Sequence, residues 1–484
     1  MSQEVRINVG AAEVRVAVLA DGRLQALSAS RTLGAGGPSS LVGDIVLGRV
    51  VRVLAAVQAA FIDIGRERAG FLGAHEAKSL KPELEGEPSI AALVREGEAV
   101  LVQIVKDPIG DKGARLTTAV TIPGRHCVLT PFQPGVAISR RIEDEAERER
   151  LTVLGGELLA GSENGCILRT AAVGVATEEL GADLDQLRRE WLRIEAAVRT
   201  AKVPSTLHRD LGPVERALRD IVRDDTTRIL IDDAQGVEQA RAYCRQSVPQ
   251  VENRIAAYTG PGGLFDELES DIEALTHPRV PLACGGWITL EGTEALTAID
   301  VNSGSFARAS GIEDTGLVVN LEAADEIGRQ VRLRGIGGLI VVDFIHMHDP
   351  DHIERVHQAL AASLARDSTP FNISAVTPFG LTEVTRKRVR EPLVALWSEP
   401  CPGCGGLGHV RRTDAVAMEA IRRIEASARA APGKLIRLHT APEIAAWLRV
   451  EGAAAALSRR GVSRLEIIAD ESFSRERLEV NSGD

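Results

Sequence analysis

The chain has 484 residues, of which 44% are hydrophobic and 26% are charged, which is the composition of a folded globular protein. At about 150 residues per domain, the length predicts about three domains, each long enough to bury its own core. Lys and Arg number 57 and Asp and Glu 68, giving a net charge of -11. This acidic balance excludes indiscriminate nucleic-acid binding through overall positive charge, although Arg140-Arg141 and the segment 385–390 form local basic clusters.

The sequence also carries no sign of a membrane or secreted protein. No apolar stretch reaches the roughly 18 residues that a membrane helix needs, since the run Leu339–Ile345 contains Asp343. The first ten residues lack the basic region and apolar core of a secretory signal. Six cysteines in so long a chain do not form a disulfide framework. We therefore expect a cytoplasmic location.

The first 120 residues read as β-structure. Apolar and polar positions alternate over the first 35 residues and turn at Asp21-Gly22, which predicts a hairpin. The run from Gly34 to Pro38 marks a boundary. Five short strand patterns follow within about 80 residues and predict a small barrel.

The middle of the chain mixes strands and helices. A strand pattern covers 166–169, and a helix is predicted over 186–200, with a core stripe of Leu187, Trp191, Ile194 and Val198. A second α/β stretch, 215–280, contains a strand that ends in Asp232-Asp233. We interpret these two acids as turn residues, because Asp suits turns.

Residues 281–400 have the clearest α/β pattern. A strand over 295–301 leads through NSGS to a helix over 315–334, which Gly335 ends. A strand over 339–345 follows, and Asp349-Pro350 starts the next helix. A CPGC loop then precedes a small strand-helix-strand domain that closes the sequence.

Asp300 and Asp343 each interrupt an apolar strand pattern, where a buried carboxylate would need a cation, a donor network or a metal. Asn302 falls on the same side of an extended chain as Asp300. Two carboxylates and an amide oxygen suit Mg²⁺, which could activate water and neutralise charge on a phosphodiester. The alternative is that both acids cap turns or pair with an arginine such as Arg386.

Cys401 and Cys404 form a single CxxC, whereas a structural zinc takes about four ligands. Either His409 and another residue complete the site, or a second chain contributes its own pair. A redox role is the competing interpretation, but redox CxxC motifs lie at helix N-termini and this one lies in a Gly/Pro loop. We favour zinc, and we interpret Cys127, Cys166, Cys244 and Cys284 as packing residues.

Two further groups have chemistry that suits RNA. Phe61 and Phe71 in the barrel segment could stack on unpaired bases while Lys112 contacts the backbone, or the rings could fill the barrel core. Arg169-Thr170 ends a strand and could grip a phosphate, although such a dipeptide is also ordinary on protein surfaces.

Three segments, GGWITLEGTEALTAIDVNSGSF, NLEAADEIGRQVRLRGIGGLIVVDFI and CPGCGGLGHV, resemble the ribonuclease E/G family of bacterial endoribonucleases and occur in the family's order. The resemblance implies a multidomain α/β and α+β fold. It implies an RNase H-like subdomain in two parts, 1–38 and 215–280, with an inserted OB-fold RNA-binding barrel at 39–119 and a 5′-end sensor at 120–214. It further implies a DNase I-like catalytic domain at 281–400, a zinc link at 401–412 and a small C-terminal α/β domain at 413–484.

The resemblance also implies roles for individual residues. Asp300 and Asp343 match the family's magnesium-binding aspartates, and Asn302 supports the ion or the attacking water. Cys401 and Cys404 match cysteines that share one zinc between two protomers, which implies a homodimer. Arg169 and Thr170 match the pocket for a 5′-monophosphate. The RNA-contacting positions of the barrel are matched by Phe61, Phe71 and Lys112.

The chain departs from the family pattern in places. The family's DFIDM is DFIHM here, so His346 replaces an acid, which could alter the surroundings of Asp343. The segment NSGSFARASG has fewer basic residues than is usual. The small domain is short, which makes a dimer of dimers doubtful. No long tail follows residue 484, so we expect no degradosome scaffold and a form closer to ribonuclease G.

We therefore expect a cytoplasmic Mg²⁺-dependent endoribonuclease acting on single-stranded, A/U-rich RNA, favouring 5′-monophosphate ends and leaving a 3′-hydroxyl and a 5′-phosphate, in rRNA or tRNA processing and mRNA decay. One alternative is a non-catalytic RNA-binding protein with the same architecture. Another is a metal phosphoesterase for small molecules, in which an RNA-binding barrel would have no purpose.

Overall fold

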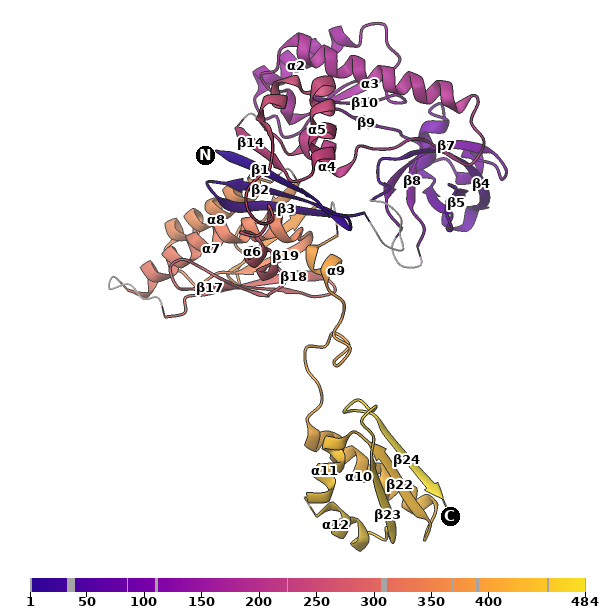
Figure 1. Cartoon of the computed structure of the whole chain (residues 1–484), viewed down its shortest axis with the longest axis vertical. Coiled ribbons are helices and arrows are strands. Elements are labelled where there is room, and N and C mark those ends of the chain that lie inside the picture. The colour runs from indigo at the N-terminus through magenta and orange to yellow at the C-terminus, as the bar shows by residue number, and fades with distance from the viewer. Residues whose placement is uncertain are drawn as a thin grey trace. The chain divides into compact units, whose positions relative to one another are not determined.

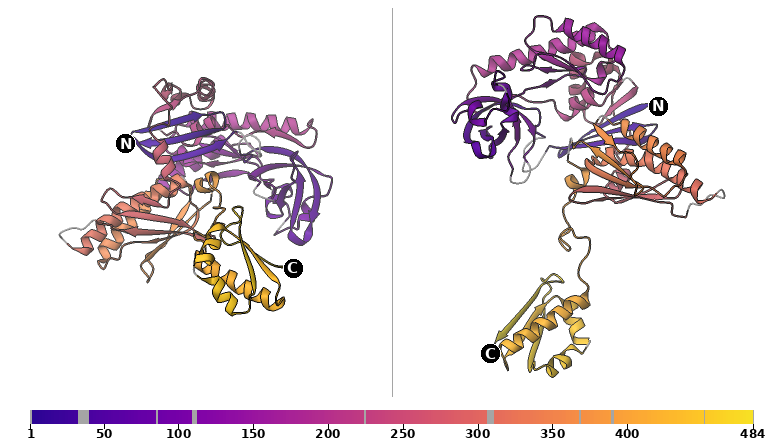
Figure 2. Two further views of the ribbon diagram at one scale, coloured as in Figure 1. Left: turned by 60° about the horizontal axis from the view of Figure 1, so that its bottom comes forward. Right: turned by 180° about the vertical axis from the view of Figure 1, so that it is seen from behind.

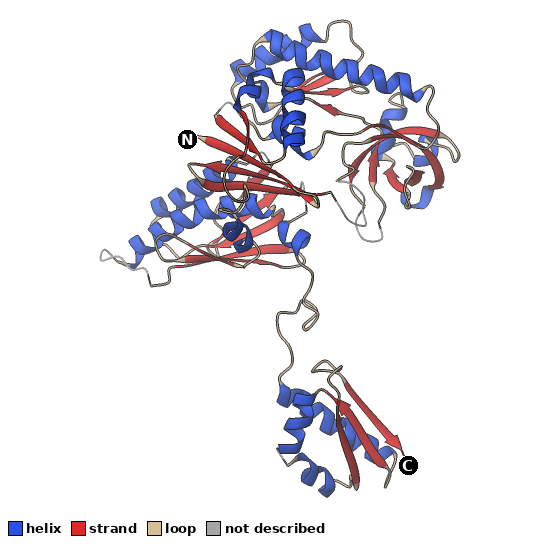
Figure 3. Cartoon of the chain, in the orientation of Figure 1, coloured by secondary structure: helices blue, strands red, loops and turns tan. Residues whose placement is uncertain are grey.

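The computed structural model describes residues 2–32, 40–84, 86–108, 112–223, 225–305, 311–367, 369–388, 391–450 and 452–483 (Figure 1). The chain divides into two compact units, Met1–Leu393 and Val394–Asp484. Both units contain strands and helices (Figure 3). Each unit is described by itself below.

The first sheet of the larger unit joins segments that are far apart in the sequence. Its order is β15-β14-β1-β2-β3, and β1 pairs in parallel with β14. The predicted hairpin at Asp21-Gly22 is confirmed, with both residues at positive φ between β2 and β3. The strands are β1 (Gln3–Val9), β2 (Glu13–Ala20), β3 (Arg23–Arg31), β14 (Thr226–Ile231) and β15 (Ile255–Ala257), and α4 (Pro213–Asp220) and α5 (Ala234–Ser247) pack beside them.

The two acids that end β14 have structural roles. Asp233 caps α5 by accepting from the Gly236 backbone N–H at 2.6 Å. Asp232 accepts from Asn8 Nδ2 and from the Val9 backbone N–H. Their interpretation as turn residues fits these contacts.

The predicted small barrel is confirmed. Its order is β4-β5-β6-β8-β7, and it closes because β7 pairs with β4. The strands are β4 (Ile45–Leu54), β5 (Ala59–Asp63), β6 (Gly70–Gly73), β7 (Ala99–Lys106) and β8 (Arg115–Thr117), while α1 (Ile90–Leu93) packs on the barrel and β13 (Ser205–His208) extends it from β4.

A third group of elements lies between the barrel and the return to the first sheet. Its sheet has the order β11-β12-β10-β9, with β9 (Ile122–Pro123), β10 (Cys127–Thr130), β11 (Gly135–Ile138) and β12 (Gly165–Leu168), and with helices α2 (Glu145–Leu158) and α3 (Thr177–Val198). The helix predicted over 186–200 thus begins nine residues earlier, and its buried apolar stripe starts at Leu180 and Leu184, ahead of the predicted stretch. Leu187, Trp191 and Ile194 are buried as predicted, whereas Val198 is half-buried.

The largest sheet has the order β16-β17-β18-β19-β21-β20. Its strands are β16 (Arg279–Pro281), β17 (Trp287–Gly292), β18 (Leu296–Asn302), β19 (Gly338–Asp343), β20 (Phe371–Ile373) and β21 (Leu381–Arg386), and α6 (Glu269–Ala274) precedes it. Figure 2 shows α7 (Ile312–Arg334) and α8 (Pro350–Ala365) together on one face of this sheet. The predicted helix ends are confirmed, with Gly335 at φ 66° after α7 and Asp349 as the N-cap of α8.

The smaller unit has its own core around α10 (Thr413–Ala430) and a three-stranded sheet of order β23-β22-β24. The elements after α10 are β22 (Leu435–Thr440), α11 (Pro442–Val450), α12 (Ala453–Arg459), β23 (Arg464–Ala469) and β24 (Leu478–Gly483). The predicted strand-helix-strand arrangement is confirmed with two helices between the parallel strands. Helix α9 (Leu393–Trp397) lies at the division of the units.

None of the helices in the described ranges combines the length and apolar character needed to cross a membrane.

The α7–α8 contact generates a stability prediction. A Cβ added to Gly328 of α7 would lie 2.7 Å from Ser363 Cβ and 2.9 Å from the Ser363 backbone carbon of α8, so the helices would have to separate. We expect Gly328→Ala to lower the free energy of unfolding by about 1–3 kcal/mol in urea titrations. Gly156→Ala in α2, where an added Cβ meets nothing within 4 Å, is the control and should not destabilise the chain. Equal effects of the two substitutions would contradict the close packing.

Candidate functional site

The two predicted metal-binding aspartates lie side by side at the ends of neighbouring parallel strands. Asp300 of β18 is in register with Asp343 of β19. Ile299, Val301 and Val342 point into the core beneath α7 and α8, so the intervening acids point to the opposite face. Asn302 Nδ2 donates to Asp300 Oδ2 at 2.6 Å. The strands thus bring three oxygen-bearing side chains to one exposed edge.

The expectation that these carboxylates are buried is wrong, because both are exposed. Side chains alternate between the faces of a strand, and the acids occupy the positions that face solvent. The alternative pairing with Arg386 is also wrong. That arginine is buried at the end of β21, where it bonds Asp367 at 2.6 Å and the Thr369 hydroxyl at 3.1 Å. Among the described side chains, no Lys or Arg forms an ion pair with Asp300 or Asp343.

The donor set fits Mg²⁺ better than a metal that needs a complete protein cage. Within the part of the chain that the structure describes, no three His, Cys, Asp or Glu side chains form a metal-binding group. Mg²⁺ commonly takes one or two carboxylates and keeps several waters, and it prefers oxygen ligands. Two exposed carboxylates and the Asn302 amide meet this requirement.

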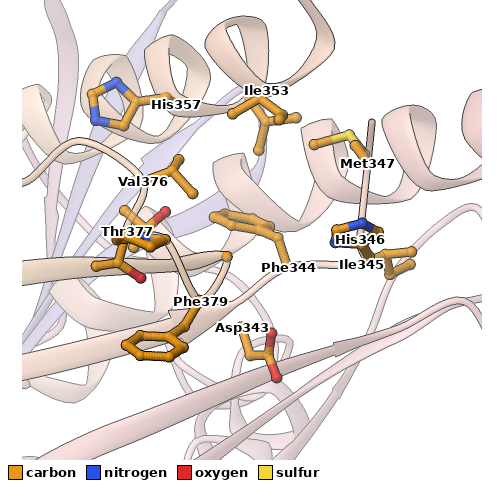
Figure 4. Close-up of a pocket in the computed structure, with 14 residues that line it drawn as sticks. Asp343, Phe344, Ile345, His346, Met347, Ile353, His357, Val376, Thr377 and Phe379 are labelled. Carbon is orange, nitrogen blue, oxygen red and sulfur yellow. The ribbon is translucent and has the colours of Figure 1, made fainter. Parts of the chain in front are cut away.

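A cavity of about 260 Å³ opens beside Asp343 (Figure 4). Its walls are the segment 343–347 that continues from β19, the turn 376–380 before β21, and Ile353, Val356 and His357 of α8. His346 is exposed on the segment 343–347 and packs edge-to-face on His348 with ring centroids 4.6 Å apart. The segment NSGSFARASG is described only in part, since 306–310 lie outside the described residues.

The other flank of the carboxylates carries a tryptophan and an arginine that sequence analysis missed. Trp287 of β17 stands opposite Asn302 in the sheet, and the Arg279 guanidinium lies 3.8 Å from the indole centroid. A Cβ at Gly304 would lie 2.9 Å from the indole, so the residue after Ser303 must be small. Side chains alternate between the two faces of a strand, so counting back along β17 from its turn into β18 would have placed Trp287 on the same face as Asp300.

The predicted aromatic pair of the barrel lies outside its core. Phe61 and Phe71 are opposite each other on β5 and β6, with ring centroids 6.0 Å apart and planes at 79°. Both rings are half-buried and neither belongs to the barrel core, so the alternative that they fill it is wrong. The register continues to exposed Arg52 on β4 and exposed Arg115 on β8. A row of cation, two rings and cation therefore crosses four strands.

Lys112 lies close to this row. It is exposed, and the segment that follows it runs along β6, where the Phe71 backbone N–H donates to Ala114 O at 2.7 Å. Its neighbours Gly110 and Asp111 lie outside the described residues. The arrangement places two aromatic rings and two arginines on one side of the barrel, and Lys112 is exposed on the segment that leads into β8.

Arg169 and Thr170 follow β12 and are partly exposed. The Arg169 guanidinium donates to Gly124 O at 2.6 Å and to Asp220 at 2.8 Å, while the Thr170 hydroxyl lies 3.3 Å from that of Ser139. Burial opposes ionisation of Asp220, but hydrogen bonds and charge from Arg219, supplemented by Arg169, lower its pKa overall. The Asp220 carboxylate therefore already orients the guanidinium of Arg169, which is predicted to bind a phosphate.

The CxxC loop of the smaller unit holds Cys401 exposed and Cys404 half-buried. Backbone N–H groups of Gly408 and Gly406 donate to the Cys404 sulfur and lower its pKa, which favours the thiolate that binds metals. The loop precedes α10 by several residues, and no third ligand joins the pair among the described side chains.

The remaining cysteines behave largely as predicted. Cys127, Cys166 and Cys244 are buried, and burial raises the pKa of Cys166 and of Cys244 to about 11. Cys284 is half-buried at the edge of the largest sheet's core. These four thiols therefore pack rather than bind.

Comparisons with known proteins identify the family of the chain. Residues 121–389 match the Ribonuclease E/G family, and residues 400–483 match a domain described as RNase E/G, Thioredoxin-like domain. The chain is 36% identical to Ribonuclease G of Escherichia coli (strain K12) and 35% identical to Ribonuclease G of Salmonella typhimurium (strain SL1344). Each match covers 93% of this chain and 93% of the relative. It is 37% identical to Ribonuclease E of Haemophilus influenzae over 94% of this chain and 48% of that protein. The chain belongs to the ribonuclease E/G family.

Proposed function

We propose that this protein is a cytoplasmic Mg²⁺-dependent endoribonuclease that cleaves single-stranded, A/U-rich RNA, in rRNA or tRNA processing and mRNA decay. The observation that carries the proposal is the in-register pair Asp300 and Asp343 on an exposed sheet face, with Asn302 bonded to Asp300. Membership of a family whose relatives are named ribonucleases supports the reaction class.

The chemistry follows from these side chains. A bound Mg²⁺ would lower the pKa of a water molecule and neutralise charge on the phosphodiester. Asp300 and Asp343 present the oxygen ligands from adjacent strands, and the bond from Asn302 Nδ2 fixes the orientation of the Asp300 carboxylate. Attack of hydroxide on phosphorus with departure of the 3′-oxygen leaves a 3′-hydroxyl and a 5′-phosphate.

The barrel row supports a single-stranded substrate. Rings of unpaired bases stack on exposed aromatic side chains, and each such stack is worth roughly 1–3 kcal/mol. Phe61 and Phe71 offer ring surface, while Arg52, Arg115 and Lys112 offer charge to the backbone. The row therefore suits RNA whose bases are not already paired.

The central test is cleavage of a short single-stranded A/U-rich RNA with Mg²⁺. We expect Asp300→Asn and Asp343→Asn each to reduce kcat by at least about 100-fold, because each removes a charged ligand. Glu291→Gln, an exposed carboxylate on β17 opposite Ala298, is the matched control and should cleave normally. Undiminished cleavage by Asp343→Asn would refute the metal assignment, and tight binding without any wild-type cleavage would make the chain a non-catalytic RNA-binding protein.

We also propose that Arg169 and Thr170 bind the 5′-monophosphate of the RNA. The support is their partial exposure and the pairing of Arg169 with Asp220, which pre-orients the guanidinium. Such a fork can bind a phosphate through two hydrogen bonds, which a lysine cannot reproduce.

Arg169→Lys tests this sensor. Wild type should cleave 5′-monophosphate RNA with a higher kcat/KM than 5′-hydroxyl RNA, and the variant should lose most of that ratio because the fork geometry is lost. The variant's cleavage of the 5′-hydroxyl RNA serves as the control and should stay near the wild-type value. An unchanged ratio would contradict the assignment.

We further propose a homodimer joined by one zinc shared between the Cys401–Cys404 pairs of two chains. The lowered pKa of Cys404 suits a thiolate ligand, and two sulfurs are half of a tetrahedral set.

Metal analysis with light scattering tests this link. We expect one zinc per two chains and monomers after chelation or in Cys401→Ser/Cys404→Ser, because a half-site cannot hold the metal. Cys284→Ser, outside the loop, is the control and should stay dimeric. One zinc per chain, or a dimer that survives loss of both cysteines, would disprove the shared site.

A further inference from the structure

Phe379 is the most exposed large apolar side chain of the turn beside the candidate active site. Its side chain is 89% exposed, although phenylalanine is usually buried. Figure 4 shows its ring at the cavity that Asp343 also lines, with Phe344 deeper in the same cavity. Singly exposed apolar side chains are common on protein surfaces, so the informative feature is that this ring stands at a cavity that Asp343 also lines.

The turn that carries this ring is fixed by its own hydrogen bonds. The Thr377 backbone N–H donates to Leu381 O at 2.8 Å, and the Gly380 N–H donates to Thr377 O at 2.9 Å. The Leu381 N–H also donates to the Thr377 hydroxyl at 3.2 Å. Leu381 stands opposite Asp343 in the sheet, so the turn is anchored directly to the strand that carries the carboxylate. The backbone that carries the ring is therefore fixed before any ligand arrives.

The character of the cavity restricts what could enter it. Its walls are largely apolar, with Ile345, Met347 and Val376 among them, and at about 260 Å³ it is smaller than the roughly 300–1,000 Å³ typical of drug-sized ligands. The Asp343 carboxylate would repel a bare phosphate at this entrance. A flat, uncharged ring has the size and the polarity that these walls accept.

We propose that this cavity binds the base of a nucleotide adjacent to the scissile phosphate, stacked on Phe379. The inference rests on the proposed function, since a phosphodiester held at Asp300 and Asp343 brings its own neighbouring nucleotides to the cavity entrance. Phe379 is then a positioning residue that fixes the RNA strand relative to the carboxylates. The stacked base can be any of the four, because every base offers a π-face.

The test pairs a protein change with an RNA change. Oligonucleotides with one cleavage site carry an abasic ribose at each flanking position in turn. We expect Phe379→Ala to lower kcat/KM by about 5- to 100-fold on intact RNA, as for loss of one base stack. At one flanking position, the abasic ribose should lower the kcat/KM of the wild type by the same factor. Phe379→Ala should then lower kcat/KM no further on that abasic RNA. Phe379→Leu should be intermediate, because it keeps apolar surface without the ring.

Binding measurements separate this inference from the catalytic proposal. Anisotropy titrations in the Asp300→Asn background without Mg²⁺ should show a similar rise in Kd on adding Phe379→Ala. If the wild type with Mg²⁺ fails to cleave RNA but Phe379→Ala still raises the Kd, the catalytic proposal fails and the base pocket stands. The control is Leu192→Ala, an apolar side chain 61% exposed on α3, which should change neither quantity.

Two results would overturn the base pocket. Normal cleavage and binding by Phe379→Ala would mean that the ring serves another ligand, such as a protein partner. Equal losses by Phe379→Ala on intact RNA and on both abasic RNAs would mean that it acts without stacking on a base.

Discussion

The candidate site depends on the register between β18 and β19. These strands run in parallel with Asp300 opposite Asp343, and apolar neighbours such as Ile299 and Val342 lie on the opposite face. A shift of one residue would move a carboxylate into the core and a buried apolar side chain to the surface. The packing of α7 and α8 on the apolar face therefore holds the acids together, and the same burial that stabilises the sheet positions its polar edge.

A buried polar network connects this arrangement to the N-terminal strands. Glu326 of α7 is 3% exposed and accepts from Arg23 of β3 at 2.6 Å and from Arg329 at 2.6 Å, while Gln330 also donates to it. Arg329 in turn donates to Leu24 O. Removing both arginines would leave the buried Glu326 charge uncompensated, which is far costlier than losing a surface pair. The first sheet thus packs against α7, which also covers the sheet that carries Asp300 and Asp343.

Local signals in the sequence predicted much of this fold. Gly335 and Asp349-Pro350 act through the backbone next to them, so the ends of α7 and α8 could be predicted without knowing the tertiary structure. Contacts such as Arg23 with Glu326 join residues 303 positions apart and leave no periodic trace. For a related reason the sequence did not predict which face of the sheet Asp300 occupies. Alternation separates the two faces of a strand but does not say which of them a helix covers. Trp287 and Arg279 were missed because their significance comes from the register with Asn302.

The negative charge of the chain bears on how the carboxylate site and the aromatic rings would each contact RNA. A protein with a net charge of -11 repels RNA at long range, and two exposed carboxylates at the reaction centre add to that repulsion. Under the proposed function, a divalent cation at the two carboxylates would cancel their negative charge where the phosphate must approach. Away from that point, the proposed stacking of bases on Phe61, Phe71 and Phe379 would require no positive charge. Cations are then needed only where the backbone passes, as at Arg52 and Arg115 beside the barrel rings.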